Sequence, residues 1–235
     1  MSKSLSLRFF LPFFLTVSLV LPALTQAQSL RDLSKQAQKG EPEAQFVLGN
    51  KYFTGDGVKR NYTKARKLWA EAAEKGHPNA LCGLGRMYAE GIAVKQNYAK
   101  ARELWAKSAA KGQVDALCAL GILYAEGKGV PQDFSLALTF FADAAKLGQR
   151  DAQCGLAQLY FAGHGVPKDY EKAYTWFASS AARGNKDATF MLGHMLENGL
   201  GVAAQPDLAL VCYELACLKG SQDACTALQK VRGKN

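Results

Sequence analysis

The sequence has few histidines, which many catalytic and metal sites use. It contains only three histidines, His77, His164 and His194, and their positions share no spacing that would converge on a metal ion. No serine lies in a nucleophile elbow, and no His–Asp pair is placed to activate one. We therefore expect no catalytic residue, no metal and no cofactor in this chain.

The sequence also lacks an uninterrupted apolar run long enough to span a membrane. Residues 9–24 are apolar, but two prolines interrupt them and two basic residues precede them. This order, followed by the possible cleavage site Thr25-Gln26-Ala27 with its small residues, is typical of a signal peptide over residues 1–27. An uncleaved anchor is the alternative, which the absence of a basic flank after Leu24 disfavours. We expect export, to a bacterial periplasm or beyond it, and no stable membrane insertion after cleavage.

Acidic residues are the minority, with 20 Asp and Glu against 29 Lys and Arg. An exported chain without an aromatic–basic platform is not expected to bind nucleic acid. The charge is uneven, because residues 44–79 hold 7 basic and 3 acidic side chains whereas residues 188–223 hold 1 and 4. The densest basic patch could attract an anionic envelope partner, or it could be a solvated helix face that maintains solubility. It consists of Lys59, Arg60, Lys64, Arg66 and Lys67.

The sequence instead consists largely of repeats of 36 residues. Each copy opens with alanine and continues through a helix-A glycine, a tyrosine, a Gly-x-Gly-Val bend and an alanine-rich aromatic segment. A fixed period of this length is typical of stacked supersecondary units rather than of one closed globule. The five copies span residues 44–79, 80–115, 116–151, 152–187 and 188–223.

Each copy predicts a helix, a tight turn and a second helix, here named helix A and helix B. Helix B is expected to begin after Asn61, Asn97, Asp133 and Asp169, whose side-chain oxygens can accept free amides of the first turn, and at Pro206 in the last copy. It should end at a glycine that can adopt the left-handed conformation. These glycines are Gly76, Gly112, Gly148, Gly184 and Gly220. No segment is typical of a strand. The recurring glycine bends predict structural turns rather than phosphate loops.

These motifs resemble the Sel1-like repeat family, whose members are related to tetratricopeptide repeats. The resemblance covers about residues 30–232 and implies an all-α, right-handed superhelical solenoid, with residues 28–43 as an N-terminal capping helix and 224–235 as a capping half-repeat. The sequence departs from the pattern in a few places: Ala93 and Ala157 replace glycines, Leu196 replaces a tyrosine, and Gln205-Pro206 replaces the usual entry to helix B.

A solenoid of this type offers a groove lined by helix A. The residue at the seventh place of helix A differs in chemical character from repeat to repeat, whereas most other places are alike. This variability indicates that the side chain there does not pack in the core. The alternative is an exposed stripe without a partner. The predicted partner-binding groove comprises Asn50, Phe53, Arg86, Glu90, Ile122, Glu126, Gln158, Phe161, His194 and Glu197.

The six cysteines fall into two groups. Cys82, Cys118 and Cys154 occupy one place in successive copies, and helices packed 8–10 Å apart are too distant for a disulfide, so we expect free thiols. Cys212 is expected in the core. The family resemblance implies a disulfide between Cys217 and Cys225, because cysteine-rich bacterial members link the end of helix B to the next helix in this way.

The resemblance also implies an adaptor role. We expect a non-catalytic scaffold that binds a protein or peptide in its helix-A groove, and so assembles or regulates a cell-envelope complex. One alternative is a β-lactamase-like hydrolase or penicillin-binding protein, because some cysteine-rich family members have been described as β-lactamases. The other is a protein that binds an anionic envelope polysaccharide through the basic patch.

Overall fold

The computed structural model describes residues 29–232, and the regular secondary structure of these residues consists of helices without any strand. The expected signal peptide, residues 1–27, lies outside the described residues. In the part that is described, no helix is both long and apolar enough to cross a membrane. The chain divides into two compact units, Met1–His77 and Pro78–Asn235, and the division falls between two helix pairs.

The first unit contains one helix pair and the helix before it. Residues 29–38 form the preceding helix, and α2 (Pro42–Thr54) and α3 (Tyr62–Glu74) form the pair. The buried side chains Ala37, Ala44 and Leu48 form a core that Leu30, Leu33 and Leu68 extend. The preceding helix thus packs directly on the first repeat.

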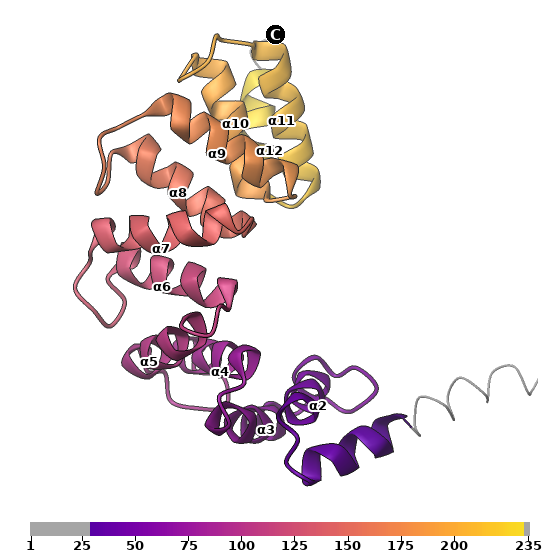
Figure 1. Cartoon of the computed structure of the whole chain (residues 1–235). Coiled ribbons are helices and arrows are strands. Elements are labelled where there is room, and N and C mark those ends of the chain that lie inside the picture. The colour runs from indigo at the N-terminus through magenta and orange to yellow at the C-terminus, as the bar shows by residue number, and fades with distance from the viewer. Residues whose placement is uncertain (1–28, 233–235) are drawn as a thin grey trace, which may run out of the picture. The chain divides into compact units, whose positions relative to one another are not determined.

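The second unit continues the same pattern as a stack of helices (Figure 1). Consecutive helices pack against each other, and α6 also contacts α8, so helix A of one repeat touches helix A of the next. This arrangement is the all-α solenoid that the repeats predict. The helices are α4 (Pro78–Glu90), α5 (Tyr98–Ala109), α6 (Val114–Glu126), α7 (Phe134–Lys146), α8 (Arg150–Ala162), α9 (Tyr170–Ala182), α10 (Lys186–Asn198), α11 (Pro206–Leu218) and α12 (Gln222–Arg232).

The ends of helix B are set by the residues that the sequence predicts. The side chains of Asn61, Asn97, Asp133 and Asp169 each accept a hydrogen bond of 2.9 Å from the backbone amide three residues later. Pro206 begins α11 at a position where no amide is required. At the other end, Gly76 and its equivalents adopt positive φ, between 77° and 89°. The predicted boundaries of helix B are therefore confirmed.

The glycine of helix A is explained by the aromatic residue of helix B. A Cβ atom at Gly85, Gly121 or Gly193 would lie within 2.6–2.7 Å of the ring of Trp105, Phe141 or Tyr213, respectively. Real atoms do not approach this closely, so the small residue is needed for each ring to lie against helix A. The fourth repeat has Ala157 at this place and accommodates Phe177, which is fully buried.

The glycines of the bends are also structural. Gly165 has a φ of 71°, and a Cβ atom there would lie 2.6 Å from the backbone carbonyl carbon of Phe134, at the start of the preceding helix B. Gly201 has the same relation to Tyr170, at 2.4 Å. Ala93, which replaces the equivalent glycine, is the one non-glycine residue with positive φ among the described residues, at 55°. The bends therefore connect and pack the repeats, as predicted.

The cysteines pair as predicted. Cys217 and Cys225 form a disulfide between α11 and α12, with their Cα atoms 4.7 Å apart. Cys82, Cys118, Cys154 and Cys212 are free. Cys118 and Cys154 are buried, whereas Cys82 and Cys212 are half-buried. Cys212 packs at the edge of the cluster formed by Leu196, Ala209 and Tyr213.

Removing the disulfide should loosen mainly the C-terminal end. The double substitution Cys217→Ser and Cys225→Ser removes the cross-link that closes a short loop. The unfolded state gains freedom, which should lower the free energy of unfolding by about 2–3 kcal/mol. Among the described helices α12 packs against α11, to which the disulfide joins it, so we expect amide hydrogen exchange to accelerate in α12 and change little in α6. Exchange measured by mass spectrometry checks this, with Cys212→Ser as the matched control. Equal acceleration in both helices would contradict it.

Candidate partner-binding site

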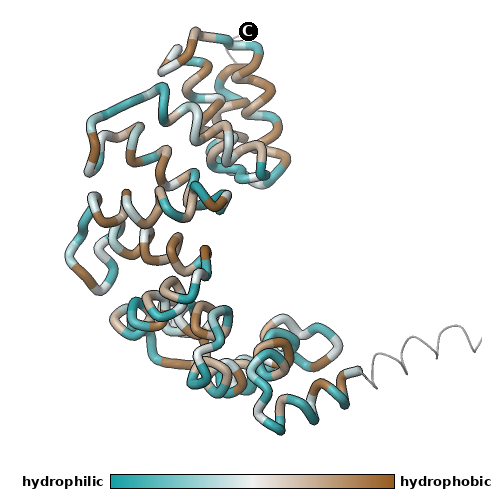
Figure 2. The backbone as a smooth tube through the Cα atoms, in the orientation of Figure 1, coloured by the Kyte–Doolittle hydropathy of each residue, from teal (hydrophilic) through white to brown (hydrophobic). Residues whose placement is uncertain are grey.

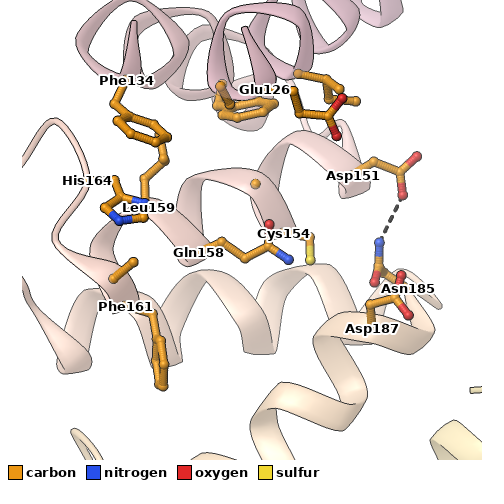
Figure 3. Close-up of a pocket in the computed structure, with 15 residues that line it drawn as sticks. Glu126, Phe134, Asp151, Cys154, Gln158, Leu159, Phe161, His164, Asn185 and Asp187 are labelled. Carbon is orange, nitrogen blue, oxygen red and sulfur yellow. Dashed lines mark hydrogen bonds between the residues drawn. The ribbon is translucent and has the colours of Figure 1, made fainter. Parts of the chain in front are cut away.

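A pocket of about 570 Å³ lies on the second unit, centred on α8. Figure 3 shows Gln158 projecting from α8 in the middle of this pocket, with Phe134 and His164 together on one side and Asp151, Asn185 and Asp187 on the other. The pocket also receives Ile122 and Glu126 from α6. Four segments therefore contribute to one site: helix α6, the start of α7, helix α8 with its following bend, and the start of α10.

One side of the pocket is aromatic. The rings of Phe134 and His164 stack with their centroids 4.4 Å apart. Phe161 is held edge-on against Tyr170, at 5.2 Å, and against the buried Phe177, at 6.4 Å. Because neighbouring rings fix their positions, these side chains lose little freedom when another molecule covers them.

The other side is polar and acidic. Asn185, the residue that caps α10, donates a hydrogen bond of 2.9 Å to the Asp151 carboxylate. Gln149 and Gln113 make the equivalent contact with the residue 34 positions earlier, so a ladder of hydrogen bonds joins the starts of successive A helices. Asp187 lies beside this ladder, and Glu126 forms an ion pair of 2.5 Å with Lys128. The rim thus contains three carboxylates, of which Asp151 forms an ion pair of 3.5 Å with Arg150 and Glu126 the one with Lys128, and the third is that of Asp187.

Cys154 also borders the pocket, but its thiol is unreactive at neutral pH. Burial, followed by the nearby carboxylates of Asp187 and Asp151, raises the pKa of this thiol to about 12. The Cys118 thiol is raised to about 12 for the same kind of reason, with burial again the main cause. Both thiols stay protonated at neutral pH and are poor nucleophiles and poor metal ligands. Among residues 29–232, no three His, Cys, Asp or Glu side chains gather as a metal site would require.

The structure brings together four of the ten groove residues that the sequence predicts. Ile122, Glu126, Gln158 and Phe161 line the pocket. Glu90 joins Ile122 and Glu126 at a second, smaller pocket of about 430 Å³. These residues occupy the helix-A positions at which the repeat varies.

The other predicted groove residues have different surroundings. His194 is half-buried and its ring is tilted against that of Phe161, at 6.2 Å. Glu197 accepts a hydrogen bond of 2.7 Å from the hydroxyl of the buried Tyr213, so it supports the core of the fifth repeat. Arg86 is exposed on α4. Asn50 and Phe53 belong to the first unit, where Phe53 packs against Tyr62 and Trp69.

The basic patch lies on the first unit, on α3 and the loop before it. Lys64 lies over the ring of Tyr52, with its Nζ 5.1 Å from the ring centroid, and Arg60 lies over Tyr62 at 5.6 Å. Lys64 and Lys67 border a pocket of about 460 Å³, together with Glu71. Lys59 is exposed, whereas Arg66 is half-buried.

Several pocket residues were not predicted, although one signal in the sequence identifies the acidic side. A polar residue, usually acidic, stands directly before the first alanine of every repeat, and this position contains Asp151 and Asp187. Phe134 and His164 have no such signal, because one begins a helix B and the other lies in the next glycine bend. Only the stacking of repeats places these two residues together.

The fold and this site define a helical-repeat protein with an open pocket on its A helices. The family model named Sel1 repeat matches residues 42–77, 78–113, 114–149, 150–185 and 186–221. The chain belongs to the Sel1 repeat family. The matched repeats begin two residues before the alanines used above to delimit them, where the structure also begins each helix A.

Solved structures of other repeat proteins are similar to this chain. A protective antigen of uropathogenic Escherichia coli strains, c5321, is 36% identical, with a TM-score of 0.74 over 86% of this chain and 43% of that chain. A Sel1 repeat protein from Oxalobacter formigenes is 26% identical, with a TM-score of 0.76 over 86% and 89%. The immunity protein Pa5087 of Pseudomonas aeruginosa, at 24% identity and a TM-score of 0.55 over 82% and 74%, shares the fold. This chain therefore spans less than half of the E. coli protein. No curated protein matches it significantly.

Proposed function

We propose that this protein is a non-catalytic scaffold that binds a segment of another protein in the pocket formed by α6, α8 and α10. The observation that supports this most directly is the coincidence of the pocket with the variable positions of helix A. Ile122 and Gln158 are exposed in its lining, where core packing does not determine their identity. A binding role explains why these positions differ between repeats while their neighbours are alike.

The lining also indicates the kind of segment that fits. The apolar side, with Phe134 and Phe161, suits an apolar side chain of the partner. Glu126 and Asp151 already form ion pairs with Lys128 and Arg150, so Asp187 is the carboxylate of the rim that most favours a basic group of the partner. We further propose that the protein acts in the cell envelope after export, which rests on the signal peptide expected over residues 1–27.

Site-specific photocrosslinking in cells tests the binding site. A photoreactive amino acid at Ile122 or Gln158 should give one shared adduct, identified by mass spectrometry, because both positions face the pocket. The matched control is Thr139, which is exposed on α7 and does not line the pocket.

A second variant separates specific binding from chance proximity. Asp187→Lys reverses one charge on the rim of the pocket, at an exposed position, and should weaken the adduct formed from position 122 several-fold without loss of helical circular dichroism. The proposal fails if positions 122 and 158 give no adduct, if Thr139 gives the same one, or if Asp187→Lys leaves the adduct unchanged.

A further inference from the structure

The pocket centred on α8 (Figure 3) has a near copy one repeat earlier. This smaller pocket, of about 430 Å³, is lined by α4, α5, α6 and the bends that follow α4 and α6. Each of its lining residues except Gln96 has an equivalent, 36 positions later, that lines the larger pocket. The two pockets are therefore one feature of the repeat, built twice. The equivalent residues include Tyr98 and Phe134, Trp105 and Phe141, and Lys128 and His164.

The two pockets adjoin each other. Ile122 and Glu126, which are exposed on α6, line both of them. Helices α6 and α8 are in contact, and packed helices lie about 8–10 Å apart. Equivalent points of the two pockets are therefore separated by about 8–10 Å, a distance that a few residues of a bound chain can span.

The fourth place of helix A is small where the pockets lie. Ala119 lines the smaller pocket and Gly155 the larger one. A Cβ atom at Gly155 would lie 2.8 Å from the ring of Phe141, so no larger residue fits there without a shift. The first and fifth repeats have Val47 and Met191 at this place. The small residues are thus confined to the middle of the array, where both pockets occur.

The ladder of hydrogen bonds between the starts of the A helices stops at Asp187. At the rung before it, Asn185 donates to Asp151. At the next rung the place of the donor amide is taken by Ser221, whose short side chain instead accepts a hydrogen bond of 3.4 Å from the Ala224 amide. Within residues 29–232, Asp187 makes no hydrogen bond or ion pair, and it is exposed on the rim of the larger pocket. Its carboxylate is therefore available to a Lys or Arg of a bound molecule.

We propose that the partner segment is extended and occupies both pockets at once, with one apolar side chain in each pocket and a basic residue beside Asp187. This inference rests on the function proposed above and specifies the segment that binds. An extended chain advances about 3.1–3.4 Å per residue, so two residues three positions apart span about 9–10 Å. In the polyproline II conformation, such residues also lie on the same side of the chain.

A helical segment fits the two pockets less well. A helix advances about 1.5 Å per residue, so its two anchors would be about seven residues apart. Its apolar face is continuous and would cover the carboxylate of Glu126, which borders both pockets and pairs with Lys128. An extended segment can place one side chain on each side of this ion pair.

Photocrosslinking at equivalent positions tests the conformation of the segment. Lys128 and His164 are exposed, one in each pocket. A photoreactive amino acid at either position should attach to the same stretch of the partner. Mass spectrometry of the digested adducts should place the two attached residues about three positions apart. A Lys or Arg should lie close to the residue attached from position 164, on the side away from the other one.

Other results of this mapping overturn the inference. Attached residues about seven positions apart would show a helix, and residues distant in the partner's sequence would show a folded surface. A stretch without a nearby Lys or Arg excludes the contact with Asp187. If positions 122 and 158 give an adduct and position 128 gives none, one segment does not occupy both pockets, yet the function proposed above stands.

Filling the smaller pocket tests whether the two are occupied together. Ala119→Met introduces the side chain that the fifth repeat has at the same place, and residue 119 does not line the larger pocket. Because one segment binds both pockets, the adduct from position 164 should decrease several-fold while circular dichroism is unchanged. Thr139→Met is the matched control on the exposed side of α7 and should leave the adduct unchanged. An undiminished adduct in a folded Ala119→Met protein overturns simultaneous occupancy, and the mapping above does not require this variant.

Discussion

Gly165→Ala should destabilise the second unit by about 2–5 kcal/mol. Two costs add at this bend. The left-handed conformation, with φ at 71°, costs a residue with a Cβ atom about 1–2 kcal/mol. The new Cβ would also lie 2.6 Å from the backbone carbonyl carbon of Phe134, and a forced backbone shift typically costs about 1–3 kcal/mol. Urea unfolding followed by circular dichroism measures the sum.

The matched control for this substitution is Gly184→Ala. Gly184 also has positive φ, at 89°, but no atom lies within 4 Å of its added Cβ. This variant should therefore incur only the conformational cost, about 1–2 kcal/mol. The difference between the two variants isolates the close approach of the bend to the preceding helix B. Equal losses would show that this approach does not contribute to stability.

Local chemistry explains why the fold was predictable from the sequence. Four of the five B helices begin at a side chain that caps them, the fifth begins at Pro206, and a glycine follows the end of each, so the limits of helix B depend on nearby residues. The 36-residue period then repeats this local information five times. The disulfide between Cys217 and Cys225 was implied only by the family resemblance, because geometry derived from the period could not pair them.

The site was predictable only in part, because stacking brings together residues with unrelated positions in the repeat. Ile122 and Gln158 belong to the variable stripe, which the sequence alone identifies. Phe134 and His164 meet only when a bend lies against the preceding helix B, at a ring distance of 4.4 Å. The sequence alone does not show that the carboxylate of Glu197, another predicted groove residue, accepts a hydrogen bond from Tyr213. Variability along helix A therefore identifies the face but not every contact on it.

The exposed apolar residues of α11, which are Leu208, Val211, Leu215 and Leu218, illustrate a different limit (Figure 2). The apolar residues of this helix are plain in the sequence, yet almost every position of α11 is apolar, so hydropathy alone cannot separate the core face from the surface. The structure separates them, because Tyr213 is 1% exposed whereas Leu218 is 85% exposed. The equivalents of Leu208, Val211 and Leu215 are polar in both α5 and α9, so the exposed face of α11 is unusual among the repeats. These equivalents are Lys100, Glu103 and Lys107 in α5 and Lys172, Thr175 and Ser179 in α9.

Phe177→Ala should cause a loss of stability of similar or greater size, about 3–5 kcal/mol. Phe177 is fully buried and packs with Cys154, Ala157 and Met195 across α8, α9 and α10. Removal of the ring leaves a cavity that the surrounding helices cannot fill, since each is also packed against its next neighbour. Thr175→Ala, on the exposed side of the same helix, should change the free energy of unfolding by less than about 0.5 kcal/mol.

The same substitution links stability to the pocket, because Phe177 lies edge-on beneath Phe161. Without that support, Phe161 can rotate away from the pocket, and the adduct from position 122 should decrease even at temperatures where the unit stays folded. Urea unfolding and photocrosslinking of the same variant measure the two effects separately. A Phe177→Ala protein that loses stability as expected but retains the full adduct would show that the pocket does not depend on the position of Phe161.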